Sequence, residues 1–140
     1  MTMTGGCLCG AVRYEITGPA LWTGHCYCRD CQKESGGGHV SVLGVAAEHL
    51  HVTKGEAARY SSPGSSGMEV VRCFCPTCGS ALFGHPTITG DNRMVRAGSL
   101  DDPSGLTMSM AIFTSHAQPW DQPPEGLMCF SEAPPPPPGH

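Results

Sequence analysis

Eight of the nine cysteines in this 140-residue chain fall into three short groups, and this clustering restricts the possible folds more than any other feature. The groups are C-x-C at 7–9, C-x-C-x-x-C at 26–31 and the same spacing again at 73–78, while Cys129 stands alone. An odd number of cysteines cannot form a fully paired disulfide framework. Such closely spaced thiols instead favour metal binding.

The composition suggests why the chain needs an additional crosslink. It contains 19 glycines and 13 prolines, and only 6% of its residues are aromatic. A chain of this length suits one domain, but its core would be poor in large side chains, and bound metal would strengthen it. We expect a single zinc domain over residues 1–130, followed by a flexible proline-rich C-terminal tail over 131–140.

Charge and hydropathy exclude some kinds of partner. No apolar signal segment opens the sequence and no apolar run could cross a membrane, so we expect a cytoplasmic protein without membrane contact. In that reducing compartment, clustered cysteines usually bind metal or carry out chemistry. The formal net charge is −4, and zinc-bound thiolates would make it more negative. We therefore expect no nucleic-acid partner, because a negative surface repels phosphate.

The hydrophobic pattern predicts an all-β fold with little helix. In residues 11–16, Val12, Tyr14 and Ile16 alternate with polar residues, as in a half-buried strand. A short helix is predicted over 29–35, ending at three glycines. Further strands are predicted at 39–45, 49–53, 69–74, 93–97 and 107–113, separated by turns that include 61–67 and 101–105.

The first and third cysteine groups look like the two halves of one closed metal site. Each ends in a glycine, which adopts the positive φ that the backbone often needs after the last ligand of a metal-binding turn. Two such turns supply four thiolates, which is the complement of a structural zinc ion. The predicted ligands of this structural zinc are Cys7, Cys9, Cys75 and Cys78.

The middle group, formed by Cys26, Cys28 and Cys31, differs because Gln32 rather than glycine follows it. Three thiolates with a fourth position left open are typical of a catalytic zinc site. The spacing equally allows a closed site, whose fourth ligand would be His25, His39, Cys73, Cys129 or a residue of another chain. If they bind no metal, Cys73 and Cys129 are expected to be small buried side chains.

The ordered set of motifs resembles the glutathione-dependent formaldehyde-activating enzyme family, which includes the centromere-protein-V-like proteins. The resemblance covers roughly residues 5–130. It is carried by GGCLCGAVRYE (5–15), HCYCRDCQKESGG (25–37), GEAARYSS (55–62), RCFCPTCGSAL (72–82), AGSLDDP (97–103) and IFTSHAQPW (112–120).

The resemblance implies an Mss4-like, or beta-tent, zinc-bound β fold of short antiparallel strands. It implies two Zn²⁺ sites: a structural one with four cysteines, and an open one at Cys26, Cys28 and Cys31, where catalysis would occur. The family's activity is the condensation of glutathione with formaldehyde to S-(hydroxymethyl)glutathione. The resemblance therefore implies a carbon–sulfur lyase whose partners are a small thiol and a small aldehyde.

Zinc held by three thiolates suits this chemistry, because it is electron-rich and accepts one more soft ligand such as a thiol. Arg29, Lys33 and Arg72 are candidates for binding glutathione carboxylates, although surface charges without a ligand are common. His25 is a candidate proton shuttle. Trp120 is expected to pack in the core or as a lid, and His39 and His116 lack metal-ligand spacing.

Three alternatives to this function remain open at the level of sequence. The first is a non-catalytic zinc-stabilised binding scaffold, which a protein side chain as the fourth ligand of the second zinc would favour. The second is a rubredoxin-type iron site, which uses the same cysteine turns and would absorb visible light. A disulfide-stapled secreted protein is the third.

Overall fold

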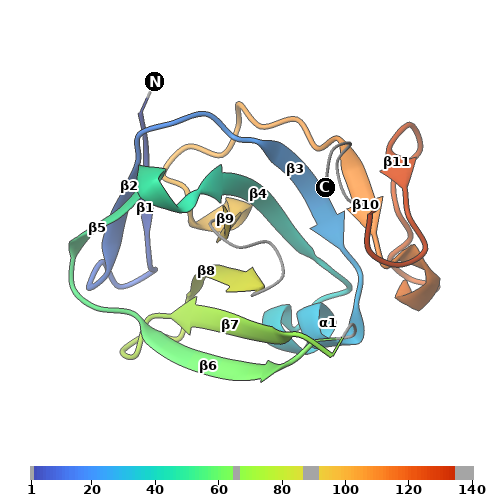
Figure 1. Cartoon of the computed structure of the whole chain (residues 1–140), viewed down its shortest axis with the longest axis horizontal. Coiled ribbons are helices and arrows are strands. Elements are labelled where there is room, and N and C mark those ends of the chain that lie inside the picture. The colour runs from blue at the N-terminus through green and yellow to red at the C-terminus, as the bar shows by residue number, and fades with distance from the viewer. Residues whose placement is uncertain (1, 65–66, 87–91, 135–140) are drawn as a thin grey trace. The chain divides into compact units, whose positions relative to one another are not determined.

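The computed structural model describes residues 2–64, 67–86 and 92–134, and consists mainly of β-strands (Figure 1). These residues contain eleven strands and one α-helix, which confirms the all-β fold class with little helix. Within the same ranges, that helix is too short to span a membrane. Much of the predicted tail over 131–140 lies outside the described residues.

The chain divides by its internal contacts into two compact units. Residues up to 22 together with 42–106 form the first unit, and residues 23–41 together with 107–140 form the second. The chain passes between them within β3 (Trp22–Cys26) and β4 (Val40–Ala46). Folding of residues 1–130 as a single domain stays a prediction.

The first unit contains a three-stranded antiparallel sheet in the order β1-β2-β5. Its strands are β1 (Met3–Gly6), β2 (Arg13–Ile16) and β5 (Leu50–Lys54). On β2 and directly before it, the alternating side chains of Val12, Tyr14 and Ile16 are all at most 1% exposed. The predicted burial of this face is therefore confirmed.

Five further strands of the first unit pair antiparallel in the order β4-β9-β8-β7-β6, and Figure 1 shows β6 and β7 running side by side. Their bounds are β6 (Ala58–Pro63), β7 (Glu69–Phe74), β8 (Ala81–Pro86) and β9 (Asn92–Arg96). The strands predicted at 39–45, 49–53, 69–74 and 93–97 are thus confirmed. The turn predicted from residue 61 begins too early, because β6 continues to Pro63 as a largely exposed strand paired with β7.

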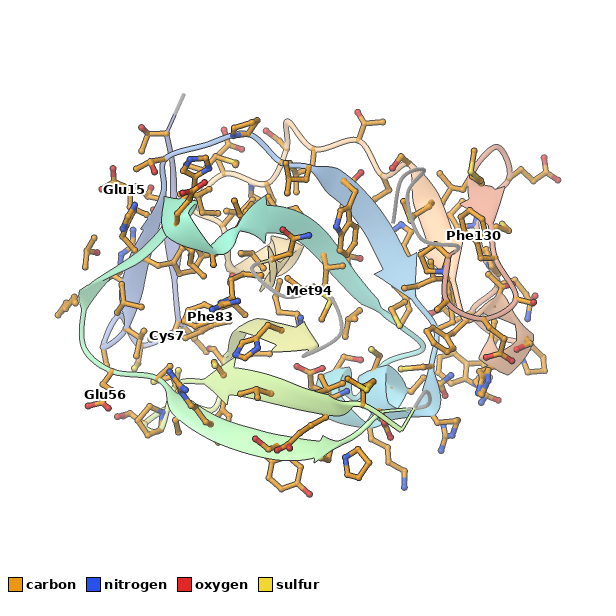
Figure 2. All side chains as sticks on the ribbon, in the orientation of Figure 1. Cys7, Glu15, Glu56, Phe83, Met94 and Phe130 are labelled. Atoms are coloured by element: carbon orange, nitrogen blue, oxygen red, sulfur yellow. The ribbon has the colours of Figure 1, made fainter. Side chains whose placement is uncertain are left out.

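A buried aromatic pair anchors the core of the first unit. Phe83, labelled in Figure 2, meets Tyr14 edge-on with ring centroids 6.0 Å apart. The Tyr14 hydroxyl lies 2.6 Å from Ser99 Oγ, which donates to the Arg96 carbonyl at 2.7 Å. Gly5 is required beside this pair, because a Cβ there would collide with the Tyr14 ring. The buried phenol thus joins β2 to the turn after β9.

The second unit contains parallel strand pairs, which the expectation of antiparallel strands did not include. In it β10 (Met110–Ile112) pairs with β3 and with β11 (Met128–Cys129), both in parallel. The strand predicted at 107–113 is therefore present but shorter. The helix α1 (Arg29–Ser35) forms as predicted and ends at Gly36, whose φ of 76° only glycine adopts easily.

Replacing Tyr14 with phenylalanine should lower the free energy of unfolding by about 1 kcal/mol, because it removes one buried hydrogen bond and keeps the ring packing. The matched control is Tyr60→Phe, since Tyr60 is 62% exposed and should tolerate loss of its hydroxyl. Thermal unfolding of the three metal-loaded proteins would measure the difference. Equal stability of all three would show that the Tyr14–Ser99 bond contributes nothing.

Candidate metal centres

Four cysteines of the first unit come together from two distant segments. Cys7 and Cys9 lie between β1 and β2, and Cys75 and Cys78 follow β7; Figure 2 labels Cys7. Their four sulfur atoms all lie within 4.8 Å of one another. The Cys7 and Cys9 sulfurs are 3.6 Å apart, and those of Cys9 and Cys75 are 3.8 Å apart.

These distances fit a tetrahedral metal site. Zinc–sulfur bonds of about 2.3 Å at tetrahedral angles place neighbouring sulfurs about 3.8 Å apart. Backbone N–H groups also point at the sulfurs, as Val12 N donates to Cys7 Sγ at 3.2 Å and Cys78 N to Cys75 Sγ at 3.4 Å. Gly10 and Gly79 have φ values of 81° and 79°, so the positive φ predicted after each turn is confirmed.

Local hydrogen bonds prepare two of these thiols to ionise. The hydroxyl of Ser80, 3.2 Å from Cys78 Sγ, and then the Ser80 amide lower the pKa of Cys78 to about 5. The Val12 amide likewise lowers the pKa of Cys7. Cysteines bind metal as thiolates, so Cys7 and Cys78 are suited to be metal ligands.

The second unit assembles the other cysteine group at the junction of β3 and α1. Cys26 ends β3, Cys28 is the N-cap of α1, and Cys31 lies in its first turns. Cys28 Sγ accepts a hydrogen bond from Cys31 N at 3.3 Å. The three sulfurs lie within 4.8 Å of one another, and each residue is 8% exposed.

Contacts within this group raise the pKa of two of its thiols, those of Cys26 and Cys31. Contact with Cys28 raises the pKa of Cys26 to about 12. The pKa of Cys31 is raised as well, by contact with Cys26, then with Cys28, and by burial. Three negative charges this close need a compensating cation, and a divalent metal supplies it. The donor set therefore fits a soft metal ion such as zinc.

No fourth His, Cys, Asp or Glu ligand joins this group among the residues that the structure describes. The residues that the sequence offered have other surroundings. Cys73, 5% exposed, packs in the hydrophobic core of the first unit, as expected of a free cysteine. Cys129 is exposed, so its expected burial is wrong: it lies on the two-residue strand β11. His25 Nδ1 lies 2.8 Å from Ser41 Oγ.

Gln32, the residue after Cys31, holds the three-cysteine segment in place. It is only 4% exposed, and its Nε2 donates to the carbonyls of Tyr27 at 2.8 Å and His116 at 3.0 Å. Its Oε1 accepts from the side chains of Arg29 and Gln118. One buried amide thus ties the backbone between Cys26 and Cys28 to a segment 84 residues away.

The segment that Gln32 contacts is itself fixed by the rest of the second unit. Phe113 has a φ of 56°, which is uncommon for a residue with a side chain. The Phe113 N–H donates to the Glu132 carbonyl at 3.0 Å, and the Thr114 N–H to the carbonyl of Phe130, labelled in Figure 2, at 3.1 Å. The turn carrying His116 is therefore held by residues 130–132 and in turn bonds Gln32 of α1.

The remaining sequence candidates are distributed over both units. Arg29 bonds Gln32, Lys33 is exposed on α1, and Arg72 of the first unit donates to Ser62 Oγ at 3.2 Å. Trp120 is 71% exposed, so its expected packing in the core is wrong. The sequence pointed to Gln32 as the residue after the middle group, but the contacts of its side chain were not predicted. One local feature marks this residue: Gln32 is a polar residue directly after Cys31 in the predicted helix, whereas the equivalent position after Cys78 is Gly79.

Comparison with known proteins agrees with this arrangement. A family model described as glutathione-dependent formaldehyde-activating enzyme matches residues 2–116. A protein of Halomonas elongata, provisionally named as such an enzyme, is 36% identical over 93 residues, which cover 59% of this chain and 55% of that protein. The chain thus matches only about half the length of this relative.

One solved structure supports the fold. The crystal structure of a Rhodobacter sphaeroides protein matches with a TM-score of 0.59 and 20% identity, covering 91% of this chain and 99% of that chain.

Replacing Gln32 with leucine should weaken metal binding at the three-cysteine group by about tenfold or more, as is usual when a partner that orients metal ligands is lost. The four-cysteine group should be unaffected. Chelator competition followed by native mass spectrometry would measure the loss of the first and of the second metal ion separately. Gln122→Leu is the matched control, because Gln122 is exposed and bonds only the Gln118 carbonyl among the described residues. Equal weakening of both groups by Gln32→Leu would contradict this positioning role.

Proposed function

Because the chain belongs to the glutathione-dependent formaldehyde-activating enzyme family, we propose that it is a zinc-dependent carbon–sulfur lyase acting on a thiol–aldehyde adduct. The reaction is of the type that joins glutathione and formaldehyde to S-(hydroxymethyl)glutathione. The observation that carries the proposal is the buried three-cysteine group, to which the described residues add no fourth ligand. The enzyme would work in a reducing cytoplasm, which keeps its nine cysteines reduced.

We assign different roles to the two cysteine groups. Cys7, Cys9, Cys75 and Cys78 would hold a structural zinc, because four thiolates complete its tetrahedral shell. The catalytic ligands would be Cys26, Cys28 and Cys31. When bound there, zinc would take a thiol as its fourth ligand and keep it deprotonated near neutral pH.

The surrounding residues would keep the catalytic thiolates in place. The Cys31 N–H bonded to Cys28 Sγ stabilises negative charge on that sulfur. Gln32 fixes the carbonyl of Tyr27, the residue between Cys26 and Cys28. Arg29 and Lys33 on α1 are the cations nearest in sequence for the carboxylates of glutathione, although Arg29 also bonds Gln32.

One observation favours a second function, a non-catalytic zinc scaffold. Each cysteine of the triad is 8% exposed, which is low for a group that must admit a substrate. In that alternative the fourth ligand would come from another chain or from a residue outside the described ranges. Thiol binding separates the two functions, because a scaffold with a complete zinc shell has no position for glutathione.

Native mass spectrometry of the zinc-loaded protein, with and without glutathione, tests the proposal. We expect two zinc ions per chain and a glutathione adduct. Replacing Cys28 with serine should remove one zinc, the adduct and the lyase activity, because it leaves two thiolates for the second metal. The fold should persist through the four-cysteine group.

The matched control is Cys129→Ser, since Cys129 belongs to neither group. This variant should keep both zinc ions, the adduct and the activity. Two zinc ions without any glutathione adduct would reject the thiol site and favour the scaffold. An adduct that survives in Cys28→Ser would place thiol binding elsewhere in the molecule.

A further inference from the structure

The second unit contains a histidine–carboxylate pair that the cysteine chemistry does not use. His39 Nδ1 lies 2.5 Å from Asp121 Oδ2, although the two residues are 82 positions apart in the sequence. Their side chains are 28% and 26% exposed, so the pair is partly shielded but reaches solvent. Such pairs often orient a histidine for proton transfer.

The backbone around His39 is shaped to bring this pair together. Gly38 is buried, and a Cβ there would collide with the Asp121 carboxylate. Ser35 Oγ donates to the His39 carbonyl at 3.1 Å and accepts from the Gly37 N–H at 3.0 Å. The three glycines after α1 therefore do more than end the helix, because the last of them makes room for the carboxylate.

The His39 ring packs against the segment that carries the cysteines. Its centroid lies 4.9 Å from that of Tyr27, the buried residue between Cys26 and Cys28. On another side it meets the ring of His25 at 4.7 Å, nearly perpendicular. His39 thus contacts the side chain of Tyr27, whose backbone joins the proposed catalytic residues Cys26 and Cys28.

His39 also has the free nitrogen that proton transfer requires. With Nδ1 directed at Asp121, the proton of the neutral ring lies on Nδ1 and the lone pair on Nε2. Within the described residues, Nε2 has no hydrogen-bond partner. His25, the candidate from sequence, differs: its Nδ1 faces the Ser41 hydroxyl, and burial followed by the charge of His39 lowers its pKa.

We propose that His39, oriented by Asp121, is the acid–base residue that moves the proton in the thiol–aldehyde reaction. This inference rests on the function proposed above and adds a catalytic residue to it. In the synthetic direction, Nε2 accepts the proton of the glutathione thiol. The sulfur electron pair then forms the S–C bond to the aldehyde carbon.

The same step returns the proton. As the S–C bond forms, the π electrons of the aldehyde C=O bond move to its oxygen, and Nε2 of the imidazolium donates the proton to that oxygen. One proton passes from sulfur to oxygen, the histidine ends neutral, and no oxidant or reductant is needed. In the lyase direction, Nε2 takes the hydroxyl proton and gives it to the departing sulfur.

Rates of the zinc-loaded protein with glutathione and formaldehyde test the inference. His39→Gln should lower kcat about 100-fold or more, the usual contribution of a general acid–base residue. Zinc content and the glutathione adduct should stay unchanged in native mass spectra. Added imidazole should restore part of the rate of His39→Ala, which a purely structural role would not allow.

Two further measurements address Asp121 and the matched control. Nitrogen NMR should show the His39 proton on Nδ1 in the parent protein and a changed tautomer in Asp121→Asn, with a reduced rate. The control is His51→Gln, because His51 is exposed on β5 of the first unit and its Nε2 faces the Thr17 hydroxyl at 3.3 Å rather than a carboxylate. Its rate should be unchanged.

The outcomes separate the two proposals. A parent protein that binds zinc but shows no lyase activity would reject the proposed function. An active parent with full activity in His39→Gln would reject only the role of His39. Loss of zinc in His39→Gln, absence of imidazole rescue in His39→Ala, or an equal rate loss in His51→Gln would also overturn that role, since each indicates a structural effect.

Discussion

The contact among four sulfurs from two distant segments is the constraint on which the first unit depends. Cys7 and Cys9 lie between the first two strands, and Cys75 and Cys78 follow β7, so one metal ion would close a loop of more than sixty residues. Closing so long a loop restricts the unfolded chain strongly. This matters in a protein with few aromatic residues, whose core relies on small side chains around Tyr14 and Phe83. The same turns set the register of β1 against β2, because the Cys7 N–H donates to the Val12 carbonyl at 3.1 Å.

The second unit depends instead on buried polar contacts. The side-chain amide of Gln32 donates to the carbonyls of Tyr27 and His116, and both of these residues lie outside the β-strands. A buried polar group fixes one arrangement strongly when every partner is in place, because each unmade bond would carry a desolvation penalty. His39 and Asp121 form a second polar contact, partly exposed, and the His39 ring packs against Tyr27. The three-cysteine segment is therefore contacted by two polar groups, and both include residues from the last third of the chain.

The sequence predicts elements with a clear local pattern and misses those without one. Alternation revealed β2, and β-branched runs revealed β4 and β7. The strand β6 was missed because Ser61, Ser62 and Pro63 resemble a turn, whereas in the structure they end an exposed strand paired with β7. Motif spacing and glycine placement sorted the cysteines into the two groups that the structure brings together. The bonds of Gln32 to His116 and Gln118 and the His39–Asp121 pair could not be predicted, because these partners lie more than eighty positions apart and no local pattern marks them.

The two C-x-C-x-x-C motifs show how one spacing supports two kinds of site. In both, the last cysteine's N–H donates to the sulfur three residues earlier, from Cys31 to Cys28 and from Cys78 to Cys75. The next residue's N–H donates to the carbonyl of that same earlier cysteine, from Gln32 to Cys28 at 3.0 Å and from Gly79 to Cys75 at 2.9 Å.

After the last cysteine, the two motifs differ in structure. Gly79 takes a positive φ and turns the chain back, whereas Gln32 continues the helix and extends an amide into the interior. Their first cysteines differ too: Cys73 lies within a strand and faces the core, while Cys26 ends a strand and joins the triad. The residue after the motif and the element before it thus differ between the motif that contributes two thiols to a group and the one that contributes three. In the function proposed above, three thiolates would leave one position of a tetrahedral metal open for a substrate.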